Sequence, residues 1–106
     1  MATTTITFTL DLDKSGQPGN AARLWLDTSR NDVIEPGEEI TFSTINGKAW
    51  FAQRDLANPT GMQFLVKFIA PVGTSWSFTA KTAQATLYTS GQQKTTTPKE
   101  ALAGRL

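Results

Sequence analysis

Apolar and polar residues alternate with a period of two along most of this chain. In the first such run, Ile6, Phe8 and Leu10 point to one side and the intervening threonines point to the other. This period is that of a β-strand with one buried face. The pattern predicts six strands, over residues 5–12, 23–27, 39–45, 48–54, 62–70 and 75–81.

Turn signals separate these runs. The dipeptide Asn46-Gly47 is the strongest hairpin signal in the chain. After Thr82 the apolar phase slips by one residue, which predicts a bulge or a short break before a seventh strand. The run 62–70 is apolar on both sides. We therefore expect that strand to lie centrally in its sheet or beneath another element.

Together these elements predict an all-β fold, an antiparallel sandwich of six to seven strands within residues 1–88. An immunoglobulin-like arrangement is one form that would fit. The polar segment 89–106 is predicted to be a C-terminal arm. Within it, residues 98–106 fit a short helix, with Thr97 as the cap and Pro98 at the first helical position.

Composition excludes several classes of function. The 106 residues include no cysteine and no histidine, so thiolate metal sites and histidine-based catalysis are absent. The net charge is +1, without a basic stripe, so nucleic-acid binding is not expected. No apolar run is long enough for a transmembrane helix. The N-terminus lacks the features of a signal peptide, which favours a cytoplasmic or particle-associated protein.

The segment 27–38 carries the clearest candidate chemistry, because oxygen donors recur at positions one, three, five, seven, nine and twelve. Ca²⁺ needs six to eight oxygen ligands at about 2.3–2.6 Å. The donors are the side chains of Asp27, Ser29, Asn31, Glu35 and Glu38 and the backbone carbonyl of Val33. The alternative is a solvated turn, because Asp, Asn, Ser, Gly and Pro are ordinary turn-forming residues.

The spacing of these residues resembles the calcium loop of the EF-hand type, here set between strands instead of helices. The resemblance covers only residues 27–38 and implies Ca²⁺ as the ligand. Position six of such a loop needs a positive φ, and it is occupied by Asp32. Successive loops of an antiparallel sandwich alternate between its two poles. Loops 28–37 and 55–61 should therefore share a pole, and Asp55 becomes a further candidate ligand.

A site between two loops at one pole is similar to that of the calcium-dependent phospholipid-binding sandwich modules. That resemblance is one of overall fold, and it implies an anionic lipid as a partner. The tryptophans suggest other partners. Trp25 and Trp50 are out of phase with their apolar neighbours, so we expect an interface or carbohydrate contact there, whereas Trp76 is in phase with Phe78 and should be core.

Three functions remain open. The first is a non-enzymatic binding module whose acidic loop holds Ca²⁺. The second is a structural subunit of a homo-oligomeric, phage or particle assembly, because free Thr-rich ends such as 1–4 and 89–106 are normally disordered unless a neighbouring copy holds them. The third is a carbohydrate-binding module. Catalysis has the least support, since no nucleophile is accompanied by a positioned base.

Overall fold

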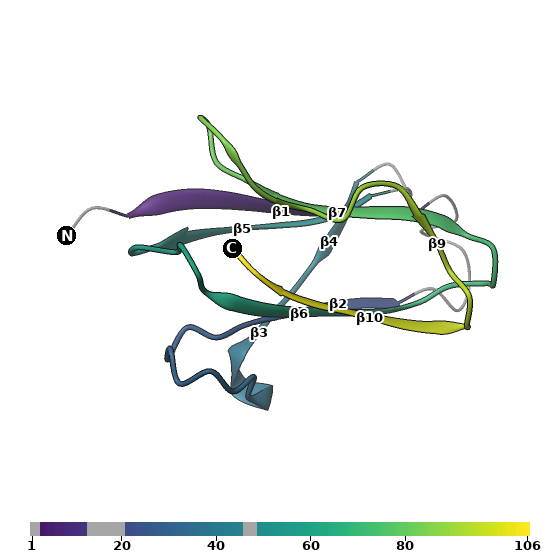
Figure 1. Cartoon of the computed structure of the whole chain (residues 1–106), viewed down its shortest axis with the longest axis horizontal. Coiled ribbons are helices and arrows are strands. Elements are labelled where there is room, and N and C mark those ends of the chain that lie inside the picture. The colour runs from purple at the N-terminus through teal and green to yellow at the C-terminus, as the bar shows by residue number, and fades with distance from the viewer. Residues whose placement is uncertain (1–2, 13–20, 46–48) are drawn as a thin grey trace.

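The computed structural model describes residues 3–12, 21–45 and 49–106. Within these ranges the chain forms two antiparallel β-sheets that pack face to face (Figure 1). The all-β sandwich predicted from the alternating pattern is therefore confirmed. No helix in the same ranges has the length and apolar character needed to cross a bilayer.

Sheet A is the larger layer, with the strand order β4-β5-β1-β7-β8 and with β9 also paired to β7. Its strands are β1 (Thr4–Leu12), β4 (Ser43–Ile45), β5 (Ala49–Leu56), β7 (Ser75–Lys81), β8 (Thr86–Thr89) and β9 (Gln93–Lys94). The slip predicted after Thr82 is confirmed as a break between β7 and β8. Their pairing also shifts register between Ala80 and Lys81.

Sheet B has the order β10-β6-β2-β3. Its strands are β2 (Ala21–Leu26), β3 (Glu39–Ile40), β6 (Gln63–Ile69) and β10 (Lys99–Arg105). The central position of β6 confirms the expectation for the strand that is apolar on both sides. The predicted strand 39–45 instead divides into β3 and β4, because the chain leaves sheet B and enters sheet A between them. The dipeptide Asn46-Gly47 lies outside the described residues.

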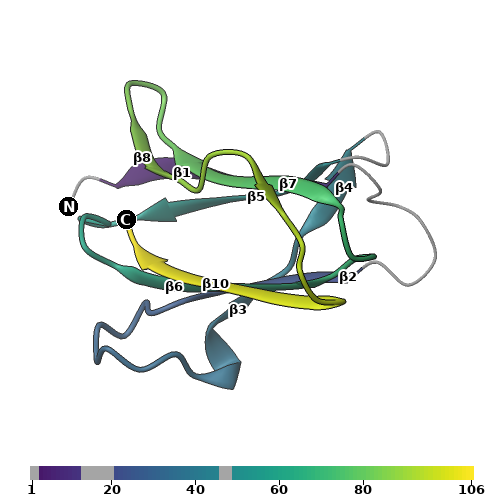
Figure 2. The ribbon, with the colours of Figure 1, turned by 45° about the vertical axis from the view of Figure 1, so that its right-hand side comes forward.

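The short helix expected over 98–106 is wrong, because residues Lys99–Arg105 form β10 and pair with β6. Figure 2 shows the chain crossing from sheet A to sheet B between β8 and β10. Glu100, expected in a first helical turn, instead accepts the backbone N–H groups of Thr96 and Thr97 at 2.9 and 3.3 Å. Pairing along a whole strand outweighs a weak local helix preference. Thus β6 of the same chain holds the segment expected to be an arm.

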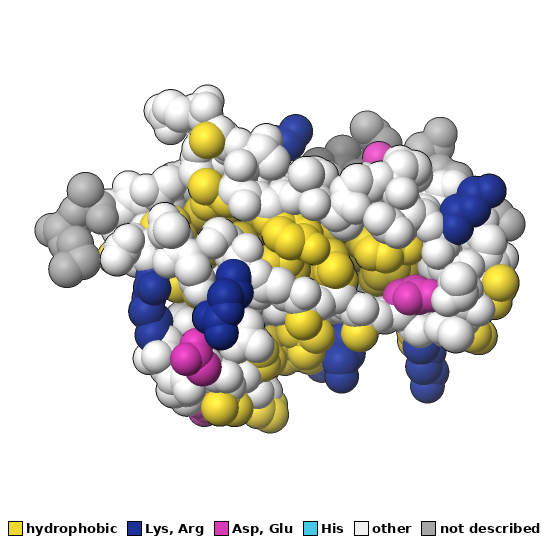
Figure 3. All heavy atoms as spheres, viewed as in Figure 1, with side chains coloured by type: hydrophobic (Ala, Val, Ile, Leu, Met, Phe, Trp, Pro, Cys, Tyr) yellow, Lys and Arg dark blue, Asp and Glu magenta, His cyan; other side chains and the backbone are white. Residues whose placement is uncertain are grey.

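The core lies between the two sheets, and Phe64 stands near its centre. Its ring centroid is 5.2 Å from that of Phe78 and 4.7 Å from that of Tyr88. A Cβ added to Gly104 would lie 2.9 Å from the Phe64 ring, so glycine allows β10 to pack closely there. Trp76 is 7% exposed, which confirms its predicted core position. Figure 3 shows hydrophobic side chains along the seam between the layers.

Candidate functional site

Asp27, the first residue of the predicted calcium loop, is a buried carboxylate directly after β2, with 2% exposure. Its Oδ2 accepts the N–H of Asp32 at 2.8 Å. Its Oδ1 accepts the N–H of Asn31 at 3.3 Å and the hydroxyl of Ser29 at 3.2 Å. A buried carboxylate is costly unless donors occupy its lone pairs. These hydrogen bonds allow the loop to fold around Asp27.

Glu38 closes the loop at the end of the single-turn 3₁₀ helix η1 (Pro36–Glu38). Its carboxylate accepts the N–H of Glu35 at 3.0 Å, the N–H of Ser29 at 3.1 Å and the Ser29 hydroxyl at 3.0 Å. Desolvation raises the pKa of Glu38, but these hydrogen bonds together outweigh it and hold the pKa below its ordinary value. The ionised carboxylate therefore ties the two ends of the loop together.

A second set of hydrogen bonds lies in the middle of the loop and is centred on Asn31. Asn31 Oδ1 accepts the N–H of Val33 at 3.1 Å, and Asn31 Nδ2 donates to Glu35 Oε1. The Val33 side chain is 56% exposed. Asp32 has a φ of 61°, the left-handed conformation that position six of a calcium loop requires. Asp32 also forms an ion pair with Arg105 of β10 at 3.2 Å, which ties the loop to sheet B.

Asp55 does not join this loop. Its Oδ1 accepts the hydroxyl of Thr5 at 2.5 Å, and the two residues lie opposite each other on sheet A. The predicted meeting of the two loops is nevertheless confirmed, because Arg30 donates to the backbone carbonyls of Ala57 and Asn58. The alternation of poles thus predicts which loops meet, but it does not predict where a strand residue directs its side chain.

The arrangement brings Asp27, Ser29 and Glu38 together, since the Ser29 hydroxyl touches both carboxylates. Asn31 and Glu35 form a separate pair. Among the described residues, no group of three or more acidic, histidine or cysteine side chains is placed to hold a metal ion. The backbone N–H groups of the loop already satisfy these carboxylates, so a cation would have to compete with them.

Trp25 lies within β2 on the outer face of sheet B. Its chain neighbours Leu24 and Leu26 are fully buried, so the alternation turns the indole outward. Directly across the sheet are Leu65 of β6 and Glu39 of β3. The indole is half-buried. It therefore retains an exposed part while its position is fixed by the strands beside it.

Two cations flank this indole. The guanidinium carbon of Arg23 is 5.3 Å and the Lys67 Nζ is 5.9 Å from the ring centroid. Arg23 also donates to both carboxylate oxygens of Glu39, at 2.8 and 3.0 Å. Those hydrogen bonds and the Glu39 charge raise the pKa of Arg23, against a smaller effect of desolvation. Glu39 thus offsets the charge of Arg23, whereas Lys67 has no ion pair within the described part of the chain.

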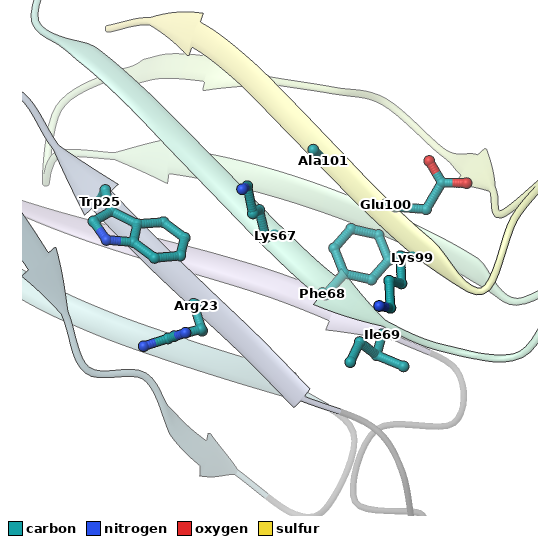
Figure 4. Close-up of a pocket in the computed structure, with 8 residues that line it drawn as sticks. All are labelled: Arg23, Trp25, Lys67, Phe68, Ile69, Lys99, Glu100 and Ala101. Carbon is teal, nitrogen blue, oxygen red and sulfur yellow. The ribbon is translucent and has the colours of Figure 1, made fainter. Parts of the chain in front are cut away.

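A hollow opens on each side of Trp25. The larger, of about 480 Å³, extends towards β10 and is lined by Lys67, Ile69 and Lys99 as well as Trp25 (Figure 4). The smaller, of about 280 Å³, extends towards the loop and is lined by Leu65 and Glu39. We call these hollows and the indole between them the Trp25 surface. Sequence reasoning missed the lysines, because their position along the larger hollow depends on which strands pair.

Trp50, the other tryptophan predicted to contact a partner, is also half-buried but packs against the core. Its Nε1 is buried and has no hydrogen-bond partner within the described residues. Trp50 lies opposite Leu10, which is fully buried, so it shares the inner face of sheet A. The structure therefore places Trp25, and not Trp50, on an outer face of the sandwich.

Comparison of the chain with protein-family models, with curated proteins and with solved structures finds no match. We therefore infer the function from the geometry of the acidic loop and of the Trp25 surface.

Proposed function

We propose that the protein is a non-enzymatic binding module that holds a carbohydrate chain on the outer face of sheet B. The observation that carries this proposal is the half-buried indole of Trp25 with a hollow on each side. The rigid, flat face of an indole offers a large contact area at a small entropic cost, and it matches the apolar face of a sugar ring.

The neighbours of Trp25 support the same proposal. Leu65 adds apolar area opposite the indole, and Ile69 adds it further along the larger hollow. Arg23 with Glu39 supplies fixed donors and acceptors within reach of the hydroxyls of a sugar ring. Binding sites for small molecules combine such an apolar lining with a few polar groups. The site is an open sheet face, which suits a chain that passes across it better than a compact ligand.

Replacement of Trp25 provides the test. We expect Trp25→Ala to weaken oligosaccharide binding by at least about ten-fold, because it removes the central aromatic anchor. Trp25→Phe should retain part of the affinity. The matched control is Phe51→Ala, which removes a half-buried aromatic from the outer face of sheet A and should leave binding unchanged. Titrations followed by calorimetry and by amide chemical shifts would measure both effects. Equal losses in the two alanine variants would contradict the proposal.

Calcium binding by residues 27–38 is a second candidate function. The observation that favours it is the convergence of Asp27 and Glu38 on the Ser29 hydroxyl, which joins positions one, three and twelve of the loop. Binding would require these carboxylates to exchange part of their N–H contacts for the ion.

Isothermal titration of chelator-treated protein with Ca²⁺ tests this second function. We expect heat of binding and a higher Tm at millimolar ion, both abolished by Glu38→Gln. Asp55→Asn is the matched control, because Asp55 belongs to the outer face of sheet A and should not affect the ion. The absence of heat and of a Tm shift at millimolar Ca²⁺ would rule out calcium binding.

A further inference from the structure

We infer that the carbohydrate bound at the Trp25 surface is acidic, a polymer of uronate sugars whose carboxylates pair with Lys67 and Lys99. This inference rests on the proposed function and names the class of its ligand. It follows from the distribution of charge around the larger hollow and from the geometry of the strands.

Among the described residues, neither lysine at the rim of the hollow has an acidic partner. Within the described ranges the ion pairs are Arg23 with Glu39 and Arg105 with Asp32, and neither involves Lys67 or Lys99. Glu100 also lines the hollow, but its carboxylate accepts the N–H groups that precede β10. The hollow therefore presents two cations to a ligand, and anionic groups are their natural partners.

Strand register places Lys67 one outward-facing row from Trp25 and Lys99 two rows from it, because Lys99 lies opposite Ile69. Lys67 lies directly opposite Arg23 on β2 and opposite Ala101 on β10, while Leu65 lies opposite Trp25. Positions two residues apart on a strand are about 7 Å apart. Along the strands, the row of Lys67 is therefore about 7 Å and the row of Lys99 about 14 Å from the row of Trp25. A polymer with one carboxylate on each ring can stack on Trp25 and place neighbouring carboxylates near the lysines.

An acidic peptide fits this surface less well. Extended peptides are usually recognised by addition to a sheet edge, where backbone N–H and C=O groups are free to pair. The backbone of β6 is paired on both sides, and β2 pairs with β3 at Leu24 and Trp25, so the backbone around the indole is already paired. The edge strand β10 borders the hollow only at its far side, along residues 99–101. A sugar chain needs no backbone ladder, and it presents the flat faces that an indole can stack against.

The experiment uses the full chain and a panel of uronate oligomers of galacturonate, mannuronate and glucuronate. Each acidic oligomer is paired with its methyl-esterified form, which has the same rings without the charge. We expect at least one acidic oligomer to bind about ten-fold more tightly than its ester, with the difference lost in about 0.5 M NaCl. Lys67→Gln and Lys99→Gln should each weaken that binding by about three-fold, and the double variant by about ten-fold.

Lys81→Gln is the matched control, because Lys81 is an exposed lysine on the outer face of sheet A. Equal affinity for an acidic oligomer and its ester, with Trp25→Ala still harmful, overturns the acidic-ligand inference and leaves the proposed function standing. No binding by any member of the panel overturns both. Poly-glutamate that binds as tightly as the oligomers, without dependence on Trp25, overturns the inference in favour of an acidic peptide.

Discussion

The two outer faces of this sandwich follow the same alternation but carry different chemistry. On sheet A, the outward positions of β1 and β7 hold hydroxyl side chains, among them Thr7, Thr9, Ser77 and Thr79. On sheet B, the corresponding positions hold an indole, aliphatic side chains and cations, and Figure 3 shows basic side chains projecting from that layer. Strand propensity explains the threonines. The same propensity favours Trp25, but it does not explain the two hollows that flank this side chain.

The two outer faces also differ in how their polar side chains pair with one another. On sheet A, Thr5 donates to Asp55, and Gln53 donates to Thr7 at 3.1 Å, so neighbouring strands pair their polar groups. On sheet B, Lys67 and Lys99 have no such partners within the described residues. Lys81 on sheet A is likewise without an ion pair among the described residues, so what distinguishes sheet B is that its lysines line one hollow together with Trp25. The comparison therefore favours sheet B as the binding face.

The largest loss of stability is expected at Phe64, in the core that lies between the two sheets. Phe64 is fully buried and touches aromatic rings from sheet A. Phe64→Ala should cost about 3–5 kcal/mol, because it removes a large core side chain and leaves a cavity. Urea denaturation followed by circular dichroism measures the loss. Phe51→Ala, on an outer face, should cost less than half as much, and equal losses would contradict the assignment of inner and outer faces.

The alternation predicted much of this fold from the sequence. Phe8, Phe64 and Phe78 each fall at the buried phase of a run, and all three are fully buried. The pattern failed where pairing partners decided the outcome. Residues 99–105 have weak local signals, and only the free side of β6 explains why they become a strand. The chain also passes from sheet B to sheet A between Ile40 and Ser43, and a simple period of two does not predict that crossing.

The next largest effect concerns the acidic loop. Asp27→Asn replaces one acceptor oxygen with an NH₂ group, which then faces the N–H donor of either Asn31 or Asp32. We expect a loss of about 2 kcal/mol of stability, since buried donors lose their partner. The loss should be the same in chelator as in millimolar Ca²⁺ if the carboxylate is purely structural. A loss that appears only with Ca²⁺ present would instead assign Asp27 to an ion site.

The sequence predicted which residues of this loop would converge better than it predicted the binding surface. Asp27, Ser29 and Glu38 meet because local chain reversal brings the two ends of a short loop together. The Trp25 surface is assembled from four strands, β2, β3, β6 and β10, which are separated in the sequence. Lys99 enters it only because β10 pairs with β6, a contact that no local pattern encodes.

A smaller effect is expected from the pH dependence of Glu38. Its pKa is lowered in the folded protein, so its contribution to stability is complete above the ordinary glutamate pKa of about 4.3 and is lost as the pH falls through the lower folded value. Wild type should therefore lose a few more degrees of Tm than Glu38→Gln between neutral pH and about pH 3. Thermal melts across that range provide the measurement, and parallel curves would show that the Glu38 contacts contribute nothing.

The smallest change in stability and binding is expected from the threonines on the outer face of sheet A. Thr9 and Thr79 lie opposite each other on β1 and β7. The double variant Thr9→Val, Thr79→Val keeps the branched shape that strands favour, so stability should change by less than about 0.5 kcal/mol. Binding of acidic oligosaccharides should also be unchanged, as measured by calorimetry. If this variant lost binding while Trp25→Ala did not, the binding site would have to be assigned to sheet A instead of sheet B. Only a face in contact with the sugar can respond to a change that leaves the fold intact.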